Sequence, residues 1–336
     1  MKILITGGAG FIGSHVTRHF VARGYEVCVA TRNTYAGKMR NLADVLPKIL
    51  LLIGDLAEPY FARQCAEWCP ELVVHMAAET HVDRAIEEPL SFVRANVTGT
   101  ATLLQAFVDH GAVQRILVYS TDEVYGPTPE GVAFDEQAPF RPTNAYSASK
   151  VGVEGLARAF WATHCLPVTV VRPCNTYGSG QHPEKVIPKF VRQLLTKQKL
   201  TLYNDGRGSR DWLHVIDHAR GVETLLRQGE AGEAYNMGAG DEHTDQEIAY
   251  EVWRVLLNAD KVTYPLPVTY VPGRPGHDRA YRMNSDKLHA LGWCPKMPFF
   301  EGFEATVLWN VAHQDWWDTD KIQGEVLCPN EPMSKG

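Results

Sequence analysis

Strand-like runs alternate with helix-like segments through the first half of the chain. The runs are rich in Ile, Leu and Val and are apolar at almost every position. Such strands suit a parallel sheet that helices cover on both faces, so the alternation predicts an α/β fold with a doubly wound parallel sheet. The expected strands are Lys2–Thr6, Glu26–Ala30, Ile49–Ile53, Leu72–Met76, Arg115–Tyr119 and Pro167–Arg172.

A glycine-rich segment, Gly7–Gly13, follows the first predicted strand and contains both G-x-G-x-x-G and G-x-x-G-x-x-G. Because it leads directly into a predicted helix, its backbone N–H groups and the helix dipole can receive a pyrophosphate. This context favours a Rossmann-like dinucleotide site over a tight turn that binds no ligand. The residues expected to contact the cofactor here are Gly7, Gly10, Phe11, Ile12 and Gly13.

The end of the second predicted strand bears on the choice between NAD and NADP. An NAD-binding fold usually presents an acidic residue there to the ribose hydroxyls, whereas this chain has Thr31 and Arg32. Arg32 can pair with a ribose 2′-phosphate, or it can be a solvated surface arginine. Asp55, after the third strand, can accept a hydrogen bond from the adenine amino group or serve as a turn residue. We therefore predict NAD(P) as cofactor, with NADP favoured locally.

The second half of the chain is less regular, with short strands and helices between Gly and Pro clusters. We predict a dinucleotide-binding domain over residues 1–180 and mainly a substrate lobe over residues 181–336, with some elements returning to the first domain. Thr244 and Glu247 form a capping box that predicts a helix running to Leu257. The Pro265–Pro275 region is expected to be loop and edge strand.

The net charge, the cysteine content and the length of the apolar runs restrict the class of protein. A formal net charge of -6 argues against a general nucleic-acid binder, so no nucleic-acid partner is expected. The seven Cys include no C-x-x-C pair, which suits a cytoplasmic setting. Cys65 with Cys69 lacks a second ligand pair nearby, so we expect two buried thiols there and no metal. The chain shows no cationic and apolar leader and no membrane-length apolar run, so no membrane partner is expected.

Two short segments carry groups for proton and hydride chemistry. Tyr146 and Lys150 are four residues apart on a predicted helix, which places phenol and ammonium on one face. The spacing also occurs in ordinary surface pairs, but here the preceding strand ends in Thr121, Asp122 and Glu123, at the sheet edge where such folds bind ligands. Turn and cap roles for these residues are the alternative. We predict an active site with a hydroxyl, two carboxylates and a Tyr–Lys pair.

With these motifs the chain resembles the extended short-chain dehydrogenase/reductase superfamily and, within it, the dTDP-glucose 4,6-dehydratase family. Related epimerases and decarboxylases share the glycine loop and Y-x-x-x-K but generally lack the acidic pair Asp122 and Glu123. The departure is Thr31, where the family usually has Asp. The resemblance runs almost end to end through Gly7–Gly13, Tyr35–Gly37, Ala77–Arg84, Ser120–Gly126, Tyr146–Lys150, Asn175–Gly178, His182–Lys185, Arg210–Trp212 and Arg274–Asp278.

The resemblance implies a redox-neutral dehydration of a nucleotide-diphosphate hexose, most readily dTDP-glucose or UDP-glucose. Tyr146, its pKa lowered by Lys150 and the nicotinamide, would take the 4-hydroxyl proton, which Thr121 orients, while C4 gives hydride to the cofactor. Glu123 would then remove the C5 proton while protonated Asp122 donates to the departing C6 hydroxyl. Hydride return to C6 gives a 4-keto-6-deoxy sugar, and the protein is thus expected to be a hydro-lyase.

The resemblance also implies the remaining contacts. Arg210 and His277 are expected to contact the substrate. The alternatives are that Arg210 forms a structural ion pair with Asp211 and that His277 merely occupies a turn. The helices expected over Ser91–His110 and Ala145–Cys165 would form a four-helix contact in a homodimer. Further cofactor contacts are expected at Thr31, Arg32, Asp55, Leu56, Ala77, Tyr146 and Lys150. Substrate contacts are expected at Thr80, His81, Asn175, Glu184, Lys185, Arg210 and His277.

Two other functions compete with dehydration. A nucleotide-sugar 4-epimerase or uronate decarboxylase would use Tyr146 and the cofactor but would not need both carboxylates. A non-catalytic dinucleotide sensor would need only the fold. The complete set of Thr, Asp, Glu, Tyr and Lys disfavours both.

Overall fold

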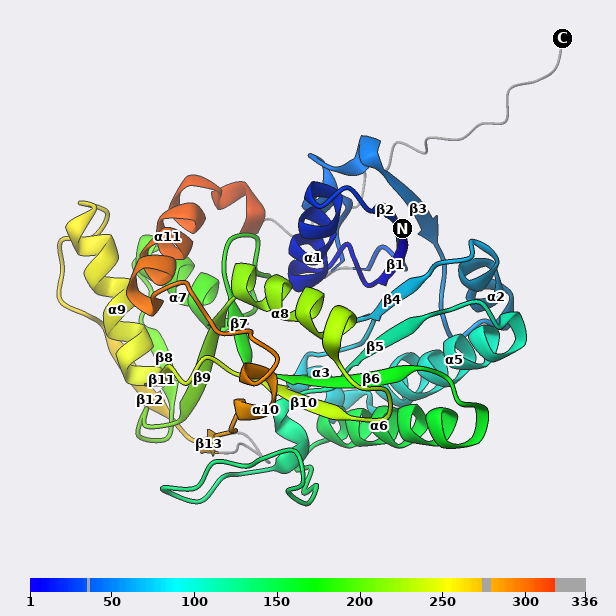
Figure 1. The fold of residues 1–336 in the computed structure, drawn as a ribbon. Helices are drawn as coiled ribbons and strands as arrows, with labels where there is room; N and C mark the ends of the chain where they lie inside the picture. The colour runs from blue at the N-terminus through cyan, green and yellow to red at the C-terminus, as the bar shows by residue number, and fades with distance from the viewer. Residues whose placement is uncertain (35–36, 274–278, 318–336) are drawn as a thin grey trace, which may run out of the picture.

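Seven parallel strands form the centre of the larger part of the molecule, in the order β10-β6-β5-β4-β1-β2-β3 (Figure 1). The computed structural model describes residues 1–34, 37–273 and 279–317. This confirms the predicted doubly wound sheet, with strand ends within one residue of those expected. The strands are β1 Lys2–Thr6, β2 Glu26–Thr31, β3 Ile49–Ile53, β4 Leu72–His75, β5 Arg115–Tyr119, β6 Val168–Pro173 and β10 Ala234–Met237.

Helices cover both faces of this sheet (Figure 1). Side chains alternate across a strand, so on β1 Ile3 and Ile5 pack into one hydrophobic layer and Leu4 packs into the other. Both layers are buried, which explains why the strand has no polar position in its centre. The helices of the first layer are α1 Phe11–Ala22 and α8 Val215–Gln228, and those of the second are α2 Pro59–Glu67, α5 Gly99–His110 and α6 Ala145–His164.

The predicted helix over Ser91–His110 contains a wide turn in its first half. It consists of α4 Pro89–Phe92, the π-helical segment η3 Val93–Thr98 and α5. Asn96, in the π-helical segment, donates to the Glu79 carbonyl at 3.1 Å and accepts from the Glu79 backbone N–H at 2.8 Å. The segment therefore holds the loop that follows β4, as π-turns at functional sites often do.

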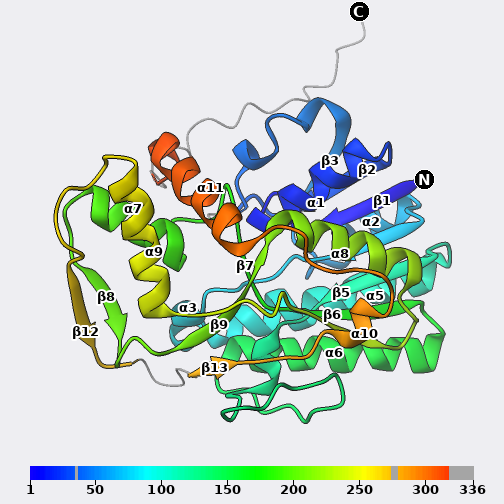
Figure 2. The same ribbon diagram turned by 60° about the vertical axis from the view of Figure 1, so that its left-hand side comes forward.

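The smaller lobe packs helices against short strands around its own hydrophobic cluster, and Figure 2 shows it beside the main sheet. Thr244 caps α9 through the predicted capping box with Glu247. The strands are β7 Asn175–Tyr177, β8 Leu200–Tyr203, β9 Ser209–His214, β11 Glu242–Thr244, β12 Val268–Val271 and β13 Ala280–Tyr281. The helices are α7 Val186–Leu195, α9 Asp245–Asn258 and α11 Phe299–Ala312. The expected loop and edge strand near Pro265 contains β12, which pairs with β8.

Elements from beyond residue 181 return to the main sheet. α8 packs against α1, and β10 pairs in parallel with β6 at the sheet edge. The remaining short elements are α3 Val82–Glu87, α10 Asp286–His289, η1 Met39–Leu42, η2 Leu46–Lys48, η4 Asp122–Tyr125 and η5 Gln314–Trp317.

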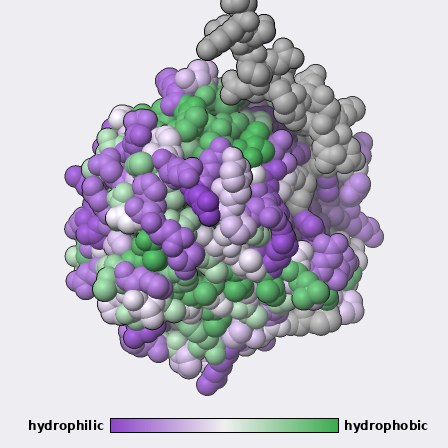
Figure 3. Space-filling view, turned by 90° about the vertical axis from the view of Figure 1, so that its right-hand side faces the viewer, coloured by the Kyte–Doolittle hydropathy of each residue, from purple (hydrophilic) through white to green (hydrophobic). Residues whose placement is uncertain are grey.

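The surface on the β3 side mixes polar side chains with separate hydrophobic patches (Figure 3). Leu50, Ile53 and Tyr60, on the edge strand and on α2, are among the exposed hydrophobic residues. Within the described ranges, every helix is too short or too polar to cross a membrane.

Candidate active site

The glycine segment forms a tight loop between β1 and α1. Gly7 has φ +71°, and a Cβ there would lie 2.9 Å from the Ala77 backbone. A Cβ on Gly13 would lie 2.2 Å from the Gly7 carbonyl oxygen, so the close approach of loop and helix requires glycine. Gly10 is the N-cap of α1, and no side chain caps it. The free backbone N–H groups and the absence of side chains fit the pyrophosphate of a dinucleotide.

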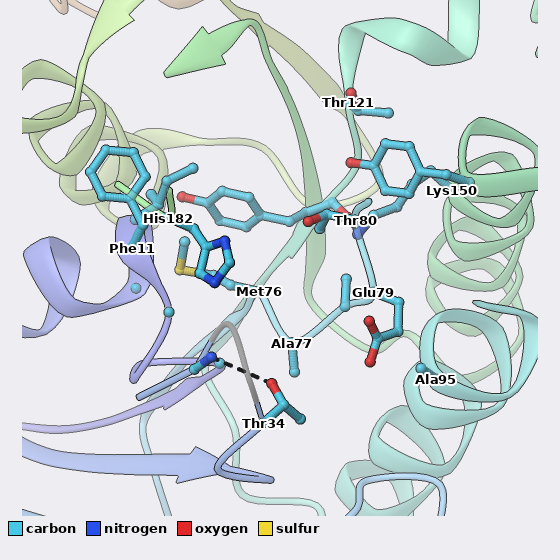
Figure 4. A pocket seen from close by; sticks show the side chains of 18 of the residues that line it. Phe11, Thr34, Met76, Ala77, Glu79, Thr80, Ala95, Thr121, Lys150 and His182 are labelled. Carbon is cyan, nitrogen blue, oxygen red and sulfur yellow. Dashed lines mark hydrogen bonds between the residues drawn. The ribbon is translucent and has the colours of Figure 1, made fainter. Parts of the chain in front are cut away.

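A cavity of about 370 Å³ runs from this loop to the carboxyl ends of β4, β5 and β6. Every residue predicted to contact the cofactor lines it. In Figure 4, Phe11 and His182 lie on one side of the cavity and Thr121 and Lys150 on the other. The Gly37 N–H donates to the Thr34 hydroxyl at 3.4 Å, and both residues line the cavity.

Arg32 lies between two carboxylates at the adenosine end of the cavity. Its Nη2 donates to Glu79 Oε1 at 2.5 Å, and its Nη1 lies 3.5 Å from Asp55 Oδ2. Arg32 is thus an exposed arginine that is paired with two carboxylates, and a 2′-phosphate would have to compete with them for it. Asp55 also accepts from the Ala57 N–H at 2.9 Å, as a turn aspartate does. Its expected adenine contact stays a prediction.

The predicted hydroxyl and carboxylates lie in the turn η4, directly after β5. Thr121 caps this turn, and its hydroxyl donates to Asp122 Oδ1 at 3.1 Å. Asp122 is buried, with 4% of its surface exposed. Glu123 is half-buried, lines the cavity and accepts from Asn144 Nδ2 at 3.2 Å. The alternative turn and cap roles are therefore real, and the same side chains also face the cavity.

Burial and the neighbouring Glu123 carboxylate raise the pKa of Asp122 to about 7. The hydrogen bond from Thr121 and the charge of Arg210 oppose this shift. An aspartate with such a pKa keeps its proton in a large fraction of the molecules at neutral pH, as a general acid requires. The two adjacent carboxyl groups thus differ in environment in the way that the predicted acid and base roles need.

The Tyr146 phenol and the Lys150 ammonium are both buried in the fold. Burial, and then the Glu123 carboxylate, raise the pKa of the Tyr146 phenol above its ordinary value, although a hydrogen bond with Thr121 opposes them. Burial also lowers the pKa of Lys150 to about 8, and its ammonium donates to the Tyr119 carbonyl at 2.9 Å. In this fold desolvation therefore acts against the lowering of the Tyr146 pKa that we expect from Lys150 and the nicotinamide together, and that lowering stays a prediction.

A second cavity adjoins the first and reaches into the smaller lobe. Arg210, on β9, lines it and stacks over the Tyr281 ring, with 4.6 Å between guanidinium and ring centre. Asp211 accepts instead from the backbone N–H groups of Ala239 and Asp241, at 2.9 and 3.0 Å. These contacts match the opposite faces that neighbouring strand residues present, so the geometry supports ligand contact for Arg210 over an ion pair with Asp211.

The other predicted substrate residues lie where the two cavities meet. Thr80, Asn175, Glu184 and Lys185 line both, and His81 lines the second. The Glu184 carboxylate lies 3.5 Å from His81 Nε2 and 3.6 Å from Lys185 Nζ. His277 falls outside the described residues.

Several lining residues were not predicted. Gln181, between Gly180 and His182, lines both cavities and donates to the Thr176 carbonyl at 3.0 Å. It lies between the resembling segments Asn175–Gly178 and His182–Lys185, which was a usable signal. The others carry no local signal, since tertiary packing brings them to the cavities: Thr34, Ala95, Asn144, Phe190, Tyr203, Asp245 and Tyr281. Among the described residues, no group of His, Cys, Asp and Glu side chains has a metal-binding arrangement.

Comparisons with known proteins agree with this geometry. Residues 3–238 match the NAD dependent epimerase/dehydratase family. The chain is 39% identical to the dTDP-glucose 4,6-dehydratase of Streptomyces niveus, with 97% of each chain covered. It is 38% identical to dTDP-glucose 4,6-dehydratase 1 of Escherichia coli, with 96% of each covered.

Solved structures lead to the same group. DesIV, the dTDP-glucose 4,6-dehydratase of Streptomyces venezuelae with NAD and TYD bound, is 41% identical with a TM-score of 0.88, covering 95% of this chain and 99% of DesIV. A UDP-glucose 4-epimerase of Thermus thermophilus in complex with NAD is 32% identical with a TM-score of 0.85. The match covers 93% of this chain and 100% of the epimerase. The chain therefore belongs to the NAD dependent epimerase/dehydratase family and, within it, to the dTDP-glucose 4,6-dehydratase family.

Proposed function

We propose that this protein is a nucleotide-sugar 4,6-dehydratase, which converts an NDP-hexose to the NDP-4-keto-6-deoxyhexose and water. The observation that carries the proposal is the pair Asp122 and Glu123, which faces the same cavity as Tyr146 and Lys150. Oxidation at C4 alone needs only the tyrosine, whereas loss of water from C5 and C6 needs an acid and a base as well.

Tyr146 acts as the base for the sugar 4-hydroxyl. Thr121 shares a hydrogen bond with the phenol and orients the 4-hydroxyl between them. Lys150, whose ammonium donates to the Tyr119 carbonyl, places its positive charge on the same face of α6 as Tyr146. The nicotinamide supplies two things when bound: hydride exchange with the sugar carbons, and a positive charge that favours the phenolate.

Elimination uses the two carboxyl groups in opposite roles. The 4-keto group acidifies C5–H, and Glu123 removes that proton. Asp122, whose pKa burial raises to about 7, donates in its protonated form to the C6 hydroxyl as water leaves. The proton on Glu123 then returns to C5 as C6 receives the hydride. The proton that Tyr146 took from the 4-hydroxyl replaces the one that Asp122 gave to water, so the reaction consumes no external acid or base.

We propose NAD as the preferred form of the cofactor. Thr31 and Arg32 led us to expect NADP, but Glu79 and Asp55 balance the charge of Arg32. A 2′-phosphate would have to displace these carboxylates and would bring its own negative charge beside them. Calorimetric titration of cofactor-free protein tests this: NAD is expected to bind tighter, and tighter binding of NADP would contradict it. The variant Glu79→Gln should reduce the difference in affinity between NAD and NADP.

The hexose is proposed to be glucose carried on dTDP, as in the names of the relatives. Arg210 and Lys185 supply the cations for the diphosphate, and the second cavity receives the nucleoside. Residues 1–180 would then mainly hold the cofactor, and residues 181–336 mainly the nucleotide sugar.

Incubation with dTDP-glucose, UDP-glucose, GDP-mannose and UDP-N-acetylglucosamine tests the function. Mass spectrometry should show loss of one water from at least one of them, with dTDP-glucose fastest. The matched control is Asp122→Asn, which should reduce the bound cofactor without releasing water. An isomeric product of unchanged mass would indicate an epimerase, and no product with any sugar would favour the sensor.

We also propose a homodimer through α6, in a cytoplasmic setting. The exposed side of α6 carries a row of small residues: Ala148, Gly155, Ala159 and Ala162. A Cβ on Gly155 would meet no atom within 4 Å, so a second helix could approach closely. Leu90, at the start of the neighbouring helix, is 80% exposed. The cysteines in the described ranges are free thiols, which suits a reducing compartment. Cys65 is buried as expected, whereas Cys69 is exposed and the expectation of a buried thiol there is wrong.

A further inference from the structure

Asn144 connects the acidic turn to the helix that carries Tyr146. Its side-chain Oδ1 accepts from the Ser147 N–H at 2.9 Å, which caps the first turn of α6. Its Nδ2 donates to Glu123 Oε2 at 3.2 Å. One amide group thus caps a helix with its oxygen and contacts a predicted catalytic carboxylate with its nitrogen.

The backbone of Asn144 is fixed as well. Its N–H donates to the Ser147 hydroxyl at 3.3 Å, and the same hydroxyl donates to its carbonyl oxygen at 3.1 Å. The backbone is therefore held on both sides of the Cα that carries the side-chain amide. Tyr146, two residues further on, is rigidly related to it because both belong to the first turn of α6.

We propose that Asn144 is a positioning residue that holds Glu123 at a fixed distance from Tyr146, and that its amide is needed for proton removal from C5. The proposal rests on the proposed function, in which the Glu123 carboxylate is that base. A hydrogen bond to one carboxylate oxygen restricts rotation of the group, and small displacements of a catalytic group have large kinetic effects.

A capping role alone does not need asparagine. Serine and aspartate cap helices about as well as asparagine does, but serine cannot reach Glu123 with an amide donor and ionised aspartate would repel it. The residue choice therefore separates the two roles experimentally.

The test is single-turnover kinetics of Asn144→Ser, loaded with cofactor and dTDP-glucose. Reduction of the cofactor, followed by its absorbance, should keep its rate, whereas release of water should slow by about 10- to 100-fold. Reduced cofactor should accumulate, and deuterium at C5 should slow turnover more than in the parent protein. Thermal stability should be unchanged because the cap is retained.

Asn144→Asp provides a second variant. It keeps the cap and replaces the donor with a carboxylate, so water release should be slower still at pH 8 and should partly recover at low pH, where the protonated carboxyl can donate again. Equal slowing of cofactor reduction and water release, or unchanged water release in Asn144→Ser, would overturn the proposal.

Glu123→Gln separates failure of this inference from failure of the proposed function. If Glu123→Gln blocks water release and Asn144→Ser does not slow it, only the role of Asn144 is wrong. If Glu123→Gln itself releases water at the parent rate, Glu123 is not the base and the proposed mechanism is wrong.

Discussion

Asp122 and Glu123 are neighbours in the chain, yet they occupy different environments. Asp122 is buried under the turn and receives the Thr121 hydroxyl, whereas half-buried Glu123 lies at the junction of the two cavities. Burial favours the neutral form of a carboxyl group, and mutual repulsion prevents both from ionising easily. Adjacent residues of nearly the same chemistry thus acquire opposite roles.

The raised pKa of Asp122 predicts a pH dependence for elimination. Its pKa is about 7 in the fold, against an ordinary value of 3.8. The general acid is present below pH 7, so the rate of water release should fall as pH rises through about 7. In Asp122→Asn this decline should disappear, and water release should be about 10²- to 10⁴-fold slower. A pH profile of single-turnover water release checks both.

Stability gives an independent check on the same group. Because the pKa of Asp122 is raised on folding, its favourable contribution is full below its ordinary pKa and is lost as pH rises through about 7. Asp122→Asn should therefore raise the melting temperature at pH 8 more than at pH 4. An equal rise in melting temperature at pH 4 and at pH 8 would show that Asp122 is ionised in the fold at both pH values.

At the scale of elements, a buried ion pair fastens α6 to β6. Arg172 donates to the two oxygens of Glu154 at 2.9 and 2.6 Å and to the Tyr125 hydroxyl at 2.6 Å. Tyr125 in turn donates to Asn236 on β10 at 2.7 Å. Tyr125 ends the turn η4, so this network fixes the far side of the acidic turn.

Removal of one partner should be costly. Arg172→Met leaves the Glu154 carboxylate buried without its cation and should lower the free energy of unfolding by about 3–5 kcal/mol. The double variant Glu154→Leu with Arg172→Met should recover much of this loss, because no charge stays buried. Urea unfolding of both variants measures this, and additive losses in the double variant would contradict it.

Local patterns predicted the elements that depend on local chemistry. The apolar runs gave all six expected strands, and Thr244 with Glu247 gave the start of α9. β10 was not predicted because it is four residues long, includes buried Asn236, and joins the sheet only by pairing with a strand far away in sequence.

The site residues also fall into two groups, those that a local pattern reveals and those whose contacts depend on tertiary packing. Tyr146 and Lys150 share a helix face, so their spacing revealed them. Arg32 and Glu79 are 47 residues apart, and their contact depends on how two loops meet. The raised pKa of Tyr146 likewise depends on burial, which a four-residue spacing does not report.

At the scale of the whole molecule, the α6 surface predicts the oligomeric state. Gly155→Leu should prevent close helix approach and give a monomer in light scattering at the concentration where the parent is a dimer. Gly155→Ala keeps the side chain small and should remain a dimer. Helical content should not fall in either variant, because glycine is a poor helix former. A dimeric Gly155→Leu protein would place the contact elsewhere.

The central claim is that oxidation, elimination and reduction occur in one cavity on one bound sugar. The most direct measurement uses dTDP-glucose that carries deuterium at C4, with the product analysed by mass spectrometry and NMR. The claim predicts a product that has lost one water and carries the deuterium at C6. Deuterium lost to the solvent, or retained at C4 in a product of unchanged composition, would contradict it.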